Sequence, residues 1–288
     1  MKPNIKPWQL LSISYNDKLQ DTLLQQYHAA QFLAIAGRYL IPQQADDSNT
    51  SLVFLPEKQE LASQELQTDN RLVLNLSDFS LGFLKKDTLV PHEISLQGKS
   101  KSEVYDILVQ ILNKEGINTG NLKNKLHYDL LDHELLHGAA FKKNDTQFIQ
   151  EHIGYRHNAQ LILEQIAGEY PKAERVRVWP HHFDTGSIIP VRFDDQGEIT
   201  QSMGIGWAIP DSMINEPYFY LSFWAAKPSI LPENMPALTS GKWMIPEWNG
   251  GVLRLSEILR QSSPEGQYAS VRSFFTSGLL ILEQHLNP

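Results

Sequence analysis

Two series of strand-like segments, each followed by a segment with helical spacing, constrain the fold of this chain more than any other feature. In the first series, short runs rich in Leu, Val and Phe within residues 51–96 precede an apolar helical stripe over residues 100–116. In the second, the runs within residues 176–255 precede a stripe over residues 264–284. Successive strands followed by helices are typical of antiparallel sheets in α+β proteins.

Two more helices are predicted outside these series. Leu, Tyr and Ala residues recur at helical spacing after the candidate N-caps Asn16 and Asp17, which predicts a helix that ends near Leu40. A second stripe predicts a helix over residues 146–170, which Pro171 terminates. We therefore predict an α+β fold in which antiparallel meanders pack against helices. Its predicted parts are an N-terminal α+β half (1–125), a histidine-rich connector with its helix (126–170) and a C-terminal α+β half (171–288). The two halves could resemble each other, or all three parts could form one continuous domain.

Composition and charge exclude several classes of protein. The 288 residues carry a formal net charge of -8, and no run of Lys and Arg exceeds a pair, which argues against a nucleic-acid partner. The absence of Cys excludes disulfides and thiolate chemistry. No segment approaches the roughly 20 apolar residues that span a bilayer, and the first residues lack the apolar core of a signal peptide. We expect a soluble cytoplasmic protein without a membrane partner, and the oligomeric state stays open.

The densest mix of aromatic, imidazole and carboxylate groups lies in a long strand predicted over residues 176–193. Pro180 indicates a strand edge or a bulge, because it has no backbone donor. On a regular strand, His182 and Asp184 would share one face, where the carboxylate would fix the imidazole tautomer for metal binding or base catalysis. The alternative is a structural hydrogen-bonded pair that holds the bulge. The same candidate ligand-binding site includes the adjacent rings of Trp179 and His181.

A second wall of this candidate site is an aromatic strand predicted over residues 217–225. Tyr218, Tyr220 and Trp224 alternate with Phe and Leu, so neither face is fully polar and the strand should be covered on both sides. Buried Tyr hydroxyls and Trp indoles need partners, so one face could line a cavity. A large aromatic core is the alternative. His152, on the helix at 146–170, could complete the site or be a core histidine with one hydrogen-bond partner.

His133, Glu134 and His137 form the motif H-E-x-x-H. On an α-helix this spacing puts both imidazoles on one face as zinc ligands and leaves the carboxylate as the base for an attacking water. Gly138 follows the second His directly and would end such a helix, and a third ligand is not evident. A solvated histidine-rich connector is therefore the alternative to a zinc-dependent hydrolase.

The first candidate site also carries a likeness to other proteins. Its phrase W-P-x-H-F-D resembles a family of uncharacterised bacterial proteins, and the likeness extends to a glycine pair, an E-P-Y-x-Y phrase and a front loop. The matching residues are Trp179, Pro180, His182, Phe183, Asp184, Gly204, Gly206, Glu216, Pro217, Tyr218, Tyr220 and Asp46 to Thr50. The chain departs from the family pattern at residues 207–210, where relatives carry Ser-Pro, and at 242–244, where they carry histidines. The resemblance implies no known activity.

These patterns predict a small-molecule or metal-binding protein with an aromatic-lined pocket. Zinc is the one cofactor that the motifs suggest, and a small molecule is the expected partner. Two alternatives stay open: a zinc-dependent hydrolase that uses the H-E-x-x-H motif, and a structural or partner-binding protein without a ligand. Whether the protein is an enzyme is left undecided by the sequence.

Overall fold

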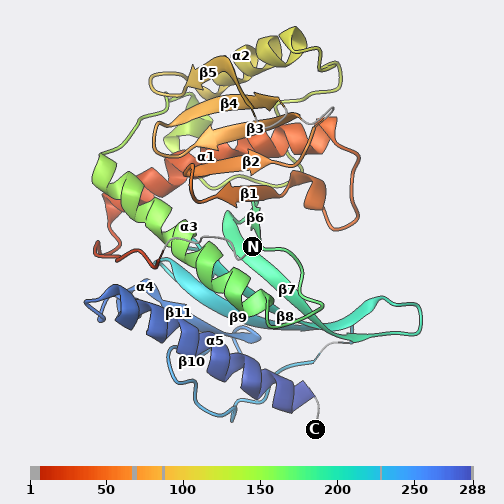
Figure 1. The fold of residues 1–288 in the computed structure, drawn as a ribbon, viewed down its shortest axis with the longest axis vertical. Coiled ribbons are helices and arrows are strands. Elements are labelled where there is room, and N and C mark those ends of the chain that lie inside the picture. The colour runs from red at the N-terminus through yellow and green to blue at the C-terminus, as the bar shows by residue number, and fades with distance from the viewer. Residues whose placement is uncertain (1–6, 67–69, 86–87, 228, 287–288) are drawn as a thin grey trace. The chain divides into compact units, whose positions relative to one another are not determined.

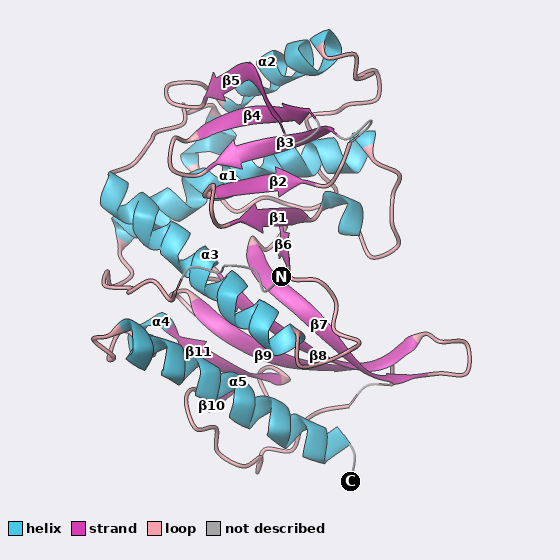
Figure 2. Cartoon of the chain, viewed as in Figure 1, coloured by secondary structure: helices cyan, strands magenta, loops and turns pink. Residues whose placement is uncertain are grey.

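The computed structural model describes residues 7–66, 70–85, 88–227 and 229–286, and for residues 88–92 it describes the backbone alone. These residues form five α-helices and eleven strands (Figure 2). The predicted mixed α+β class is confirmed, with the strands as its larger part; similarity between two halves stays a prediction. None of the helices in the described ranges combines the length and apolar character that a bilayer-spanning segment needs.

The chain forms two compact units. The first comprises Met1–Tyr15, Gly154–Val176 and Asp184–Pro288, and we refer to it as the terminal unit. The second comprises Asn16–Ile153 and Arg177–Phe183, and we refer to it as the inner unit. Along the sequence, the inner unit is thus inserted into the terminal unit. Helix α3 (Thr146–Ala167) contributes its first turns to the inner unit and the rest to the terminal unit.

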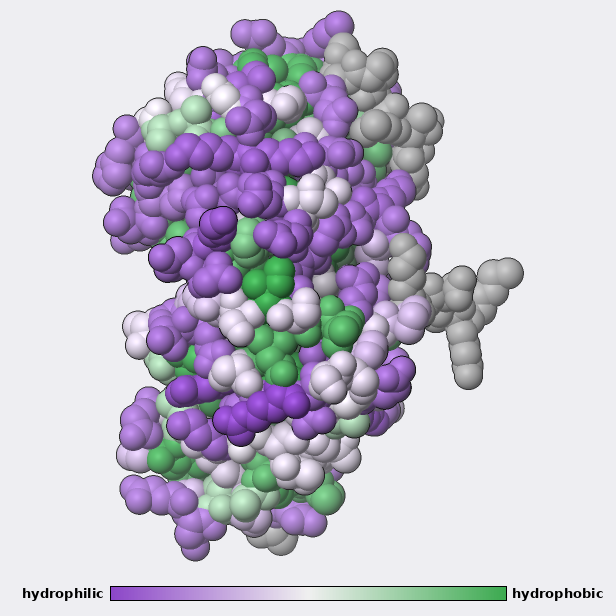
Figure 3. All heavy atoms as spheres, turned by 90° about the vertical axis from the view of Figure 1, so that its left-hand side faces the viewer, coloured by the Kyte–Doolittle hydropathy of each residue, from purple (hydrophilic) through white to green (hydrophobic). Residues whose placement is uncertain are grey.

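The inner unit contains an antiparallel sheet with the strand order β6–β1–β2–β3–β4–β5. The strands are β1 (Leu52–Leu55), β2 (Glu60–Ser63), β3 (Asn70–Asn75), β4 (Ser80–Lys85), β5 (Thr88–Ser95) and β6 (Arg177–Trp179). Helix α1 (Asp17–Leu40) packs against β2 and β3, and α2 (Lys101–Lys114) packs against β5 (Figure 1). The face of this unit in the upper part of Figure 3 is mostly hydrophilic. The predicted meander and both helices are confirmed, and β2 is an additional strand.

Helix α1 is the central helix of the inner unit. Its N-cap is Asn16, whose Oδ1 accepts the backbone N–H groups of Lys18 at 3.0 Å and Leu19 at 3.2 Å. No Asp, Glu, Lys or Arg lies between Asp21 and Arg38, and almost every residue of that stretch is buried. A helix buried on all sides carries its polar side chains into the interior, where they need partners. The buried polar side chains of α1 include Thr22, Gln25, Gln26, His28 and Gln31.

The terminal unit contains an antiparallel sheet with the strand order β10–β11–β9–β8–β7. The strands are β7 (Asp184–Phe193), β8 (Ile199–Ala208), β9 (Tyr218–Ala225), β10 (Lys242–Trp243) and β11 (Gly250–Arg254). Helix α5 (Pro264–Leu286) packs on β8, β9 and β11, and the short helix α4 (Leu255–Ile258) follows β11 directly. Phe219 of β9 meets Phe275 of α5 edge-on, with ring centroids 5.9 Å apart. One face of β9 therefore belongs to the core beneath α5.

The single strand predicted over residues 176–193 is wrong. β6 ends at Trp179, and the chain turns before β7 begins at Asp184. The Phe183 N–H donates to the Trp179 carbonyl at 2.6 Å, and the φ of Phe183, 54°, lies in the left-handed region. Pro180 cannot donate a backbone hydrogen bond, so a regular ladder cannot continue through it. As a result, His182 and Asp184 do not lie on one regular strand.

Candidate functional site

The turn after β6 places the two adjacent histidines in unequal surroundings. His181 is half-buried, whereas His182 is exposed. The ring of His181 lies 5.8 Å from that of Tyr128 and 4.3 Å from that of His182. Burial, followed by the charge of His182, lowers the pKa of His181 to about 4, so this imidazole is neutral at physiological pH. Trp179, just before the turn, is half-buried, and the guanidinium carbon of Arg177 lies over its ring, 5.9 Å from the ring centroid.

Asp184 is buried in the terminal unit and has polar partners there. The Tyr220 hydroxyl donates to Asp184 Oδ2 at 2.7 Å, and burial together with this carboxylate raises the pKa of the phenol well above its usual value. Arg156 of α3 is fully buried, and its Nη1 donates to Thr185 Oγ1 at 3.2 Å. Burial lowers the pKa of Arg156, while the charge of Asp184 opposes that effect. Of the predicted site residues, Asp184 and Tyr220 therefore lie in contact, whereas His182 belongs to the inner unit.

The ring of Tyr220 lies directly over Gly206 of the neighbouring strand β8 and reaches Gly186 of β7, one strand further along the sheet. A Cβ added to Gly206 would lie 2.2 Å from Tyr220 Cζ, and one added to Gly186 would lie 2.6 Å from its hydroxyl oxygen. Real Cβ atoms do not approach other atoms so closely. The absence of side chains at these two positions is therefore what allows the phenol to reach Asp184.

We expect the Gly206→Ala substitution to destabilise the terminal unit by about 2–3 kcal/mol, because the new methyl group overlaps a rigid ring held by a hydrogen bond. Urea unfolding followed by tryptophan fluorescence measures this loss. In a Tyr220→Ala background the overlap is gone, so the same substitution should cost little. An equal cost in both backgrounds would show that the ring is not what excludes the methyl group.

Tyr218 and Trp224 share a face of β9 with Tyr220, because side chains two residues apart point the same way. The Tyr218 hydroxyl donates to Asp211 Oδ2 at 2.6 Å, whereas Trp224 is 50% exposed. The Tyr220 ring also meets Trp248 edge-on at 6.3 Å between centroids. The Phe and Leu residues between these positions are buried, so one face of β9 is covered as predicted, whereas the other face carries the half-exposed Trp224. Each Tyr hydroxyl on this face is bound to a carboxylate.

His152, on the part of α3 that belongs to the inner unit, is completely buried. Its Nδ1 forms a short hydrogen bond with Gln26 Oε1 of α1, and its ring lies 6.1 Å from that of Phe183. Tyr27 of α1 meets the same Phe183 ring at 5.8 Å. His152 is therefore held by partners from α1 and from the turn after β6, in a different unit from Asp184.

The H-E-x-x-H segment forms a 3₁₀ turn, Glu134–His137, with His133 as its extended N-cap and Gly138 as a left-handed C-cap. His133 Nε2 donates to Asp21 Oδ1 at 3.1 Å, while the exposed His137 lies 3.6 Å from a different carboxylate. Glu134 pairs with an exposed lysine at 2.6 Å. The α-helix that aligns two zinc ligands in this motif is not formed. Among the described residues, no three His, Asp or Glu side chains gather closely enough to hold a metal ion.

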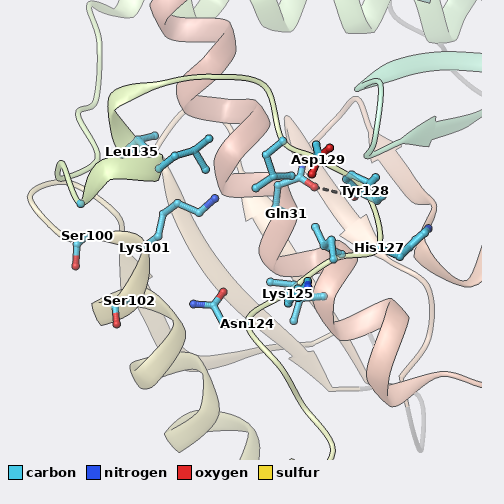
Figure 4. Close-up of a pocket in the computed structure, with 15 residues that line it drawn as sticks. Gln31, Ser100, Lys101, Ser102, Asn124, Lys125, His127, Tyr128, Asp129 and Leu135 are labelled. Carbon is cyan, nitrogen blue, oxygen red and sulfur yellow. Dashed lines mark hydrogen bonds between the residues drawn. The ribbon is translucent and has the colours of Figure 1, made fainter.

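The inner unit contains a pocket of about 960 Å³ that the sequence analysis does not predict. Its walls come from α1, from the first turn of α2 and from the irregular segment at residues 124–138 (Figure 4). The lining combines an apolar wall, amide and hydroxyl groups, and two lysines, of which Lys101 extends between these three elements and Lys125 is exposed. The lining residues include Gln31, Ile35, Lys101, Leu126, Tyr128 and Leu135.

Lys101 is the chemically distinctive residue of this pocket. Its side chain is partly buried and reaches away from α2 into the pocket, whereas the hydroxyls of Ser100 and Ser102 point away from it (Figure 4). Its Nζ donates to Nδ1 of the buried His28 at 3.3 Å. Burial lowers the pKa of Lys101 to about 8. In the part of the chain that the structure describes, no carboxylate lies within ion-pair distance of this ammonium group.

His28 is a neutral partner and does not neutralise the lysine. Burial, followed by the nearby charges of Lys101 and His133, lowers its pKa to about 3. The ring of His133 lies 5.5 Å from that of His28. At physiological pH the neutral imidazole therefore accepts a hydrogen bond from the Lys101 ammonium group but does not take up its proton.

Gln31 is fixed in place at the side of the pocket. Its Nε2 donates to the carbonyls of Tyr27 at 2.9 Å and Pro180 at 3.0 Å, and its Oε1 accepts the Tyr128 hydroxyl at 2.8 Å. Burial raises the pKa of Tyr128, so its phenol stays protonated. The apolar wall is built from Ile35, Leu126 and Leu135, all of which are buried. The pocket thus has a rigid polar side and an apolar side, as small-molecule sites do.

The fold and this site define an α+β protein with a lysine-bearing pocket of small-molecule size. No family model, no curated protein and no solved structure matches the chain. The likeness to the bacterial family with the W-P-x-H-F-D phrase therefore stays a prediction.

Proposed function

We propose that the inner unit binds a small organic acid in the pocket beside Lys101. The observation that carries this proposal is a partly buried ammonium group without a carboxylate partner among the described residues, directed into a pocket of about 960 Å³. Removing a charge from water without a counter-ion is unfavourable. A carboxylate ligand would supply that counter-ion inside the pocket and gain a charge-assisted hydrogen bond.

The rest of the lining indicates what else the ligand carries. Ile35, Leu126 and Leu135 offer an apolar surface, which favours an organic acid with a hydrocarbon or aromatic portion over a bare inorganic anion. On the other side, the Tyr128 hydroxyl is already committed to Gln31. This hydrogen bond preorganises the wall, so little side-chain ordering is needed when the ligand enters.

The proposal keeps the ligand-binding function predicted from the sequence but places it at residues that the sequence analysis passed over. A site that combines His182 with Asp184 gains no support from the geometry, because one is exposed and the other has its partners in the interior of the terminal unit. The zinc-dependent hydrolase gains no supporting observation either. The pocket beside Lys101 is the better-supported candidate.

The anionic fluorescent probe 8-anilinonaphthalene-1-sulfonate tests this proposal. We expect the Lys101→Met variant to bind it at least about 10-fold more weakly than the wild type, because the counter-charge is lost. The Lys101→Arg variant retains the charge and should stay within about 3-fold of the wild type. Fluorescence titration gives both affinities.

Lys114→Met is the matched control, since it removes an exposed lysine from the other end of the same helix. It should leave probe binding unchanged. Equal affinity of the Lys101→Met variant and the wild type would overturn the proposal. Circular dichroism of each variant establishes that the fold is retained.

A further inference from the structure

We propose that Lys101 forms a reversible imine with a 2-oxo carboxylic acid bound in the pocket. This inference rests on the proposed function and specifies its ligand class. The ammonium form of Lys101 attracts the carboxylate, and the neutral amine of the same residue attacks the adjacent carbonyl carbon. A 2-oxo acid is the ligand that uses both forms, because its carboxylate and its carbonyl lie on neighbouring carbons.

The position of Lys101 disfavours its charged form for reasons that the geometry makes plain. It occupies the first turn of α2, where the positive end of the helix dipole repels a cation. Its hydrogen-bond acceptor, Nδ1 of His28, belongs to a neutral ring. Apart from the Tyr128 phenol, the other titratable groups that line the pocket belong to the irregular segment at residues 124–138 and are exposed: Lys125, His127 and Asp129.

The hydrogen bond to His28 also orients the amine. When Nζ is neutral it has two hydrogens and one lone pair. One hydrogen is directed to His28 Nδ1, 3.3 Å away in the buried wall, so the lone pair is free to face the pocket. A neutral, oriented amine in a desolvated site is the form of lysine that reacts with carbonyl groups.

The proposed step is balanced without an oxidant or a reductant. The lone pair of Nζ forms a bond to the carbonyl carbon as the C=O π bond breaks, and one amine hydrogen passes as a proton to the carbonyl oxygen to give a neutral carbinolamine. The second hydrogen of the amine then leaves with that oxygen as water, and a C=N bond remains. A proton taken up from solvent makes the product a cationic iminium, so the positive charge beside the ligand carboxylate is restored.

Trapping with sodium cyanoborohydride tests the inference. The wild-type protein is incubated with phenylpyruvate and the reductant near neutral pH, and the modified lysine is located by peptide mass spectrometry. Burial lowers the pKa of Lys101 from 10.5 to about 8, which raises the fraction of neutral amine at pH 7 by roughly 300-fold. We therefore expect Lys101 to be alkylated about 100-fold faster than an exposed lysine such as Lys114. Phenyllactate, which has the carboxylate but a hydroxyl in place of the carbonyl, should slow the reaction by competition.

The Lys101→Arg variant separates this inference from the proposed function. It should still bind the anionic probe but lose the fast alkylation at this position. Probe binding that depends on Lys101, together with alkylation of Lys101 no faster than that of exposed lysines, would overturn the imine and leave acid binding intact. Probe binding that is indifferent to Lys101→Met would overturn both.

Discussion

At neutral pH the Lys101→Met variant is expected to be more stable than the wild type, by about 1–3 kcal/mol in the free energy of unfolding. The reason is that burial lowers the pKa of Lys101 to about 8 from the 10.5 of a free lysine, so the folded state binds this proton less tightly than the unfolded state. Below about pH 8 both states are protonated and the wild type bears the full penalty. Between about pH 8 and 10.5 the folded state releases the proton first, so the penalty declines and then disappears.

Urea unfolding of both proteins across this pH range measures the effect. The stability advantage of Lys101→Met should be largest near pH 7 and close to zero above about pH 10.5. Lys114→Met removes an exposed lysine from the same helix and should stay within about 0.5 kcal/mol of the wild type throughout. A wild-type protein more stable than Lys101→Met at neutral pH would mean that Lys101 has a structural role. A residue that weakens the fold and strengthens ligand binding fits a functional position.

The Asp184→Ala variant is expected to lose about 3–5 kcal/mol of stability in the terminal unit. Arg156 is completely buried, and the charge of Asp184 opposes the effect of burial on its guanidinium group. The substitution also removes the acceptor of the Tyr220 hydroxyl. Removing one member of a buried charged pair leaves the other without compensation, which is far more unfavourable than removing both.

A double-mutant cycle with Arg156→Met checks this explanation. The double variant should be more stable than Asp184→Ala alone, because no uncompensated charge is left. Asp195→Asn, which changes an exposed carboxylate in the β7–β8 turn, is the matched control and should change stability by less than about 0.5 kcal/mol. Additive losses in the double variant would show that Asp184 and Arg156 act independently.

Most of the fold could be predicted from hydrophobic spacing. The uncharged stretch after Asp21 and the cap at Asn16 mark α1, and Ser100 marks the start of α2 through a capping box. The short strand β2 was missed because four residues show little periodicity. The strand through Pro180 was predicted as continuous because the left-handed conformation of Phe183 has no signal in residue type.

The candidate site was much harder to predict. Helical spacing alone does not predict that His28 and Gln31 of α1 are buried. They lie in the interior because α1 is buried on all sides and not only along its apolar stripe. A lysine in a first helical turn is ordinarily a solvated residue. The available signal was electrostatic: Lys101 lies in the first turn of a helix that Ser100 caps, where a cation opposes the helix dipole. Spacing alone drew attention instead to the histidines at 133 and 137, which the 3₁₀ turn separates.

The insertion of one unit into the other has a consequence for synthesis on the ribosome. Every residue of the inner unit has been translated once Phe183 is added. The terminal unit, in contrast, combines the first residues of the chain with α5, so it is complete only after α5 has been translated. The buried Gln267 of α5 illustrates the delay, since its Oε1 accepts hydrogen bonds from Trp8 at 3.3 Å and from the Leu11 backbone at 3.0 Å. The nascent chain can therefore complete the pocket beside Lys101 early, while the opening segment, which already has a partner in Asn158 of α3, lacks its α5 partner until translation is nearly finished.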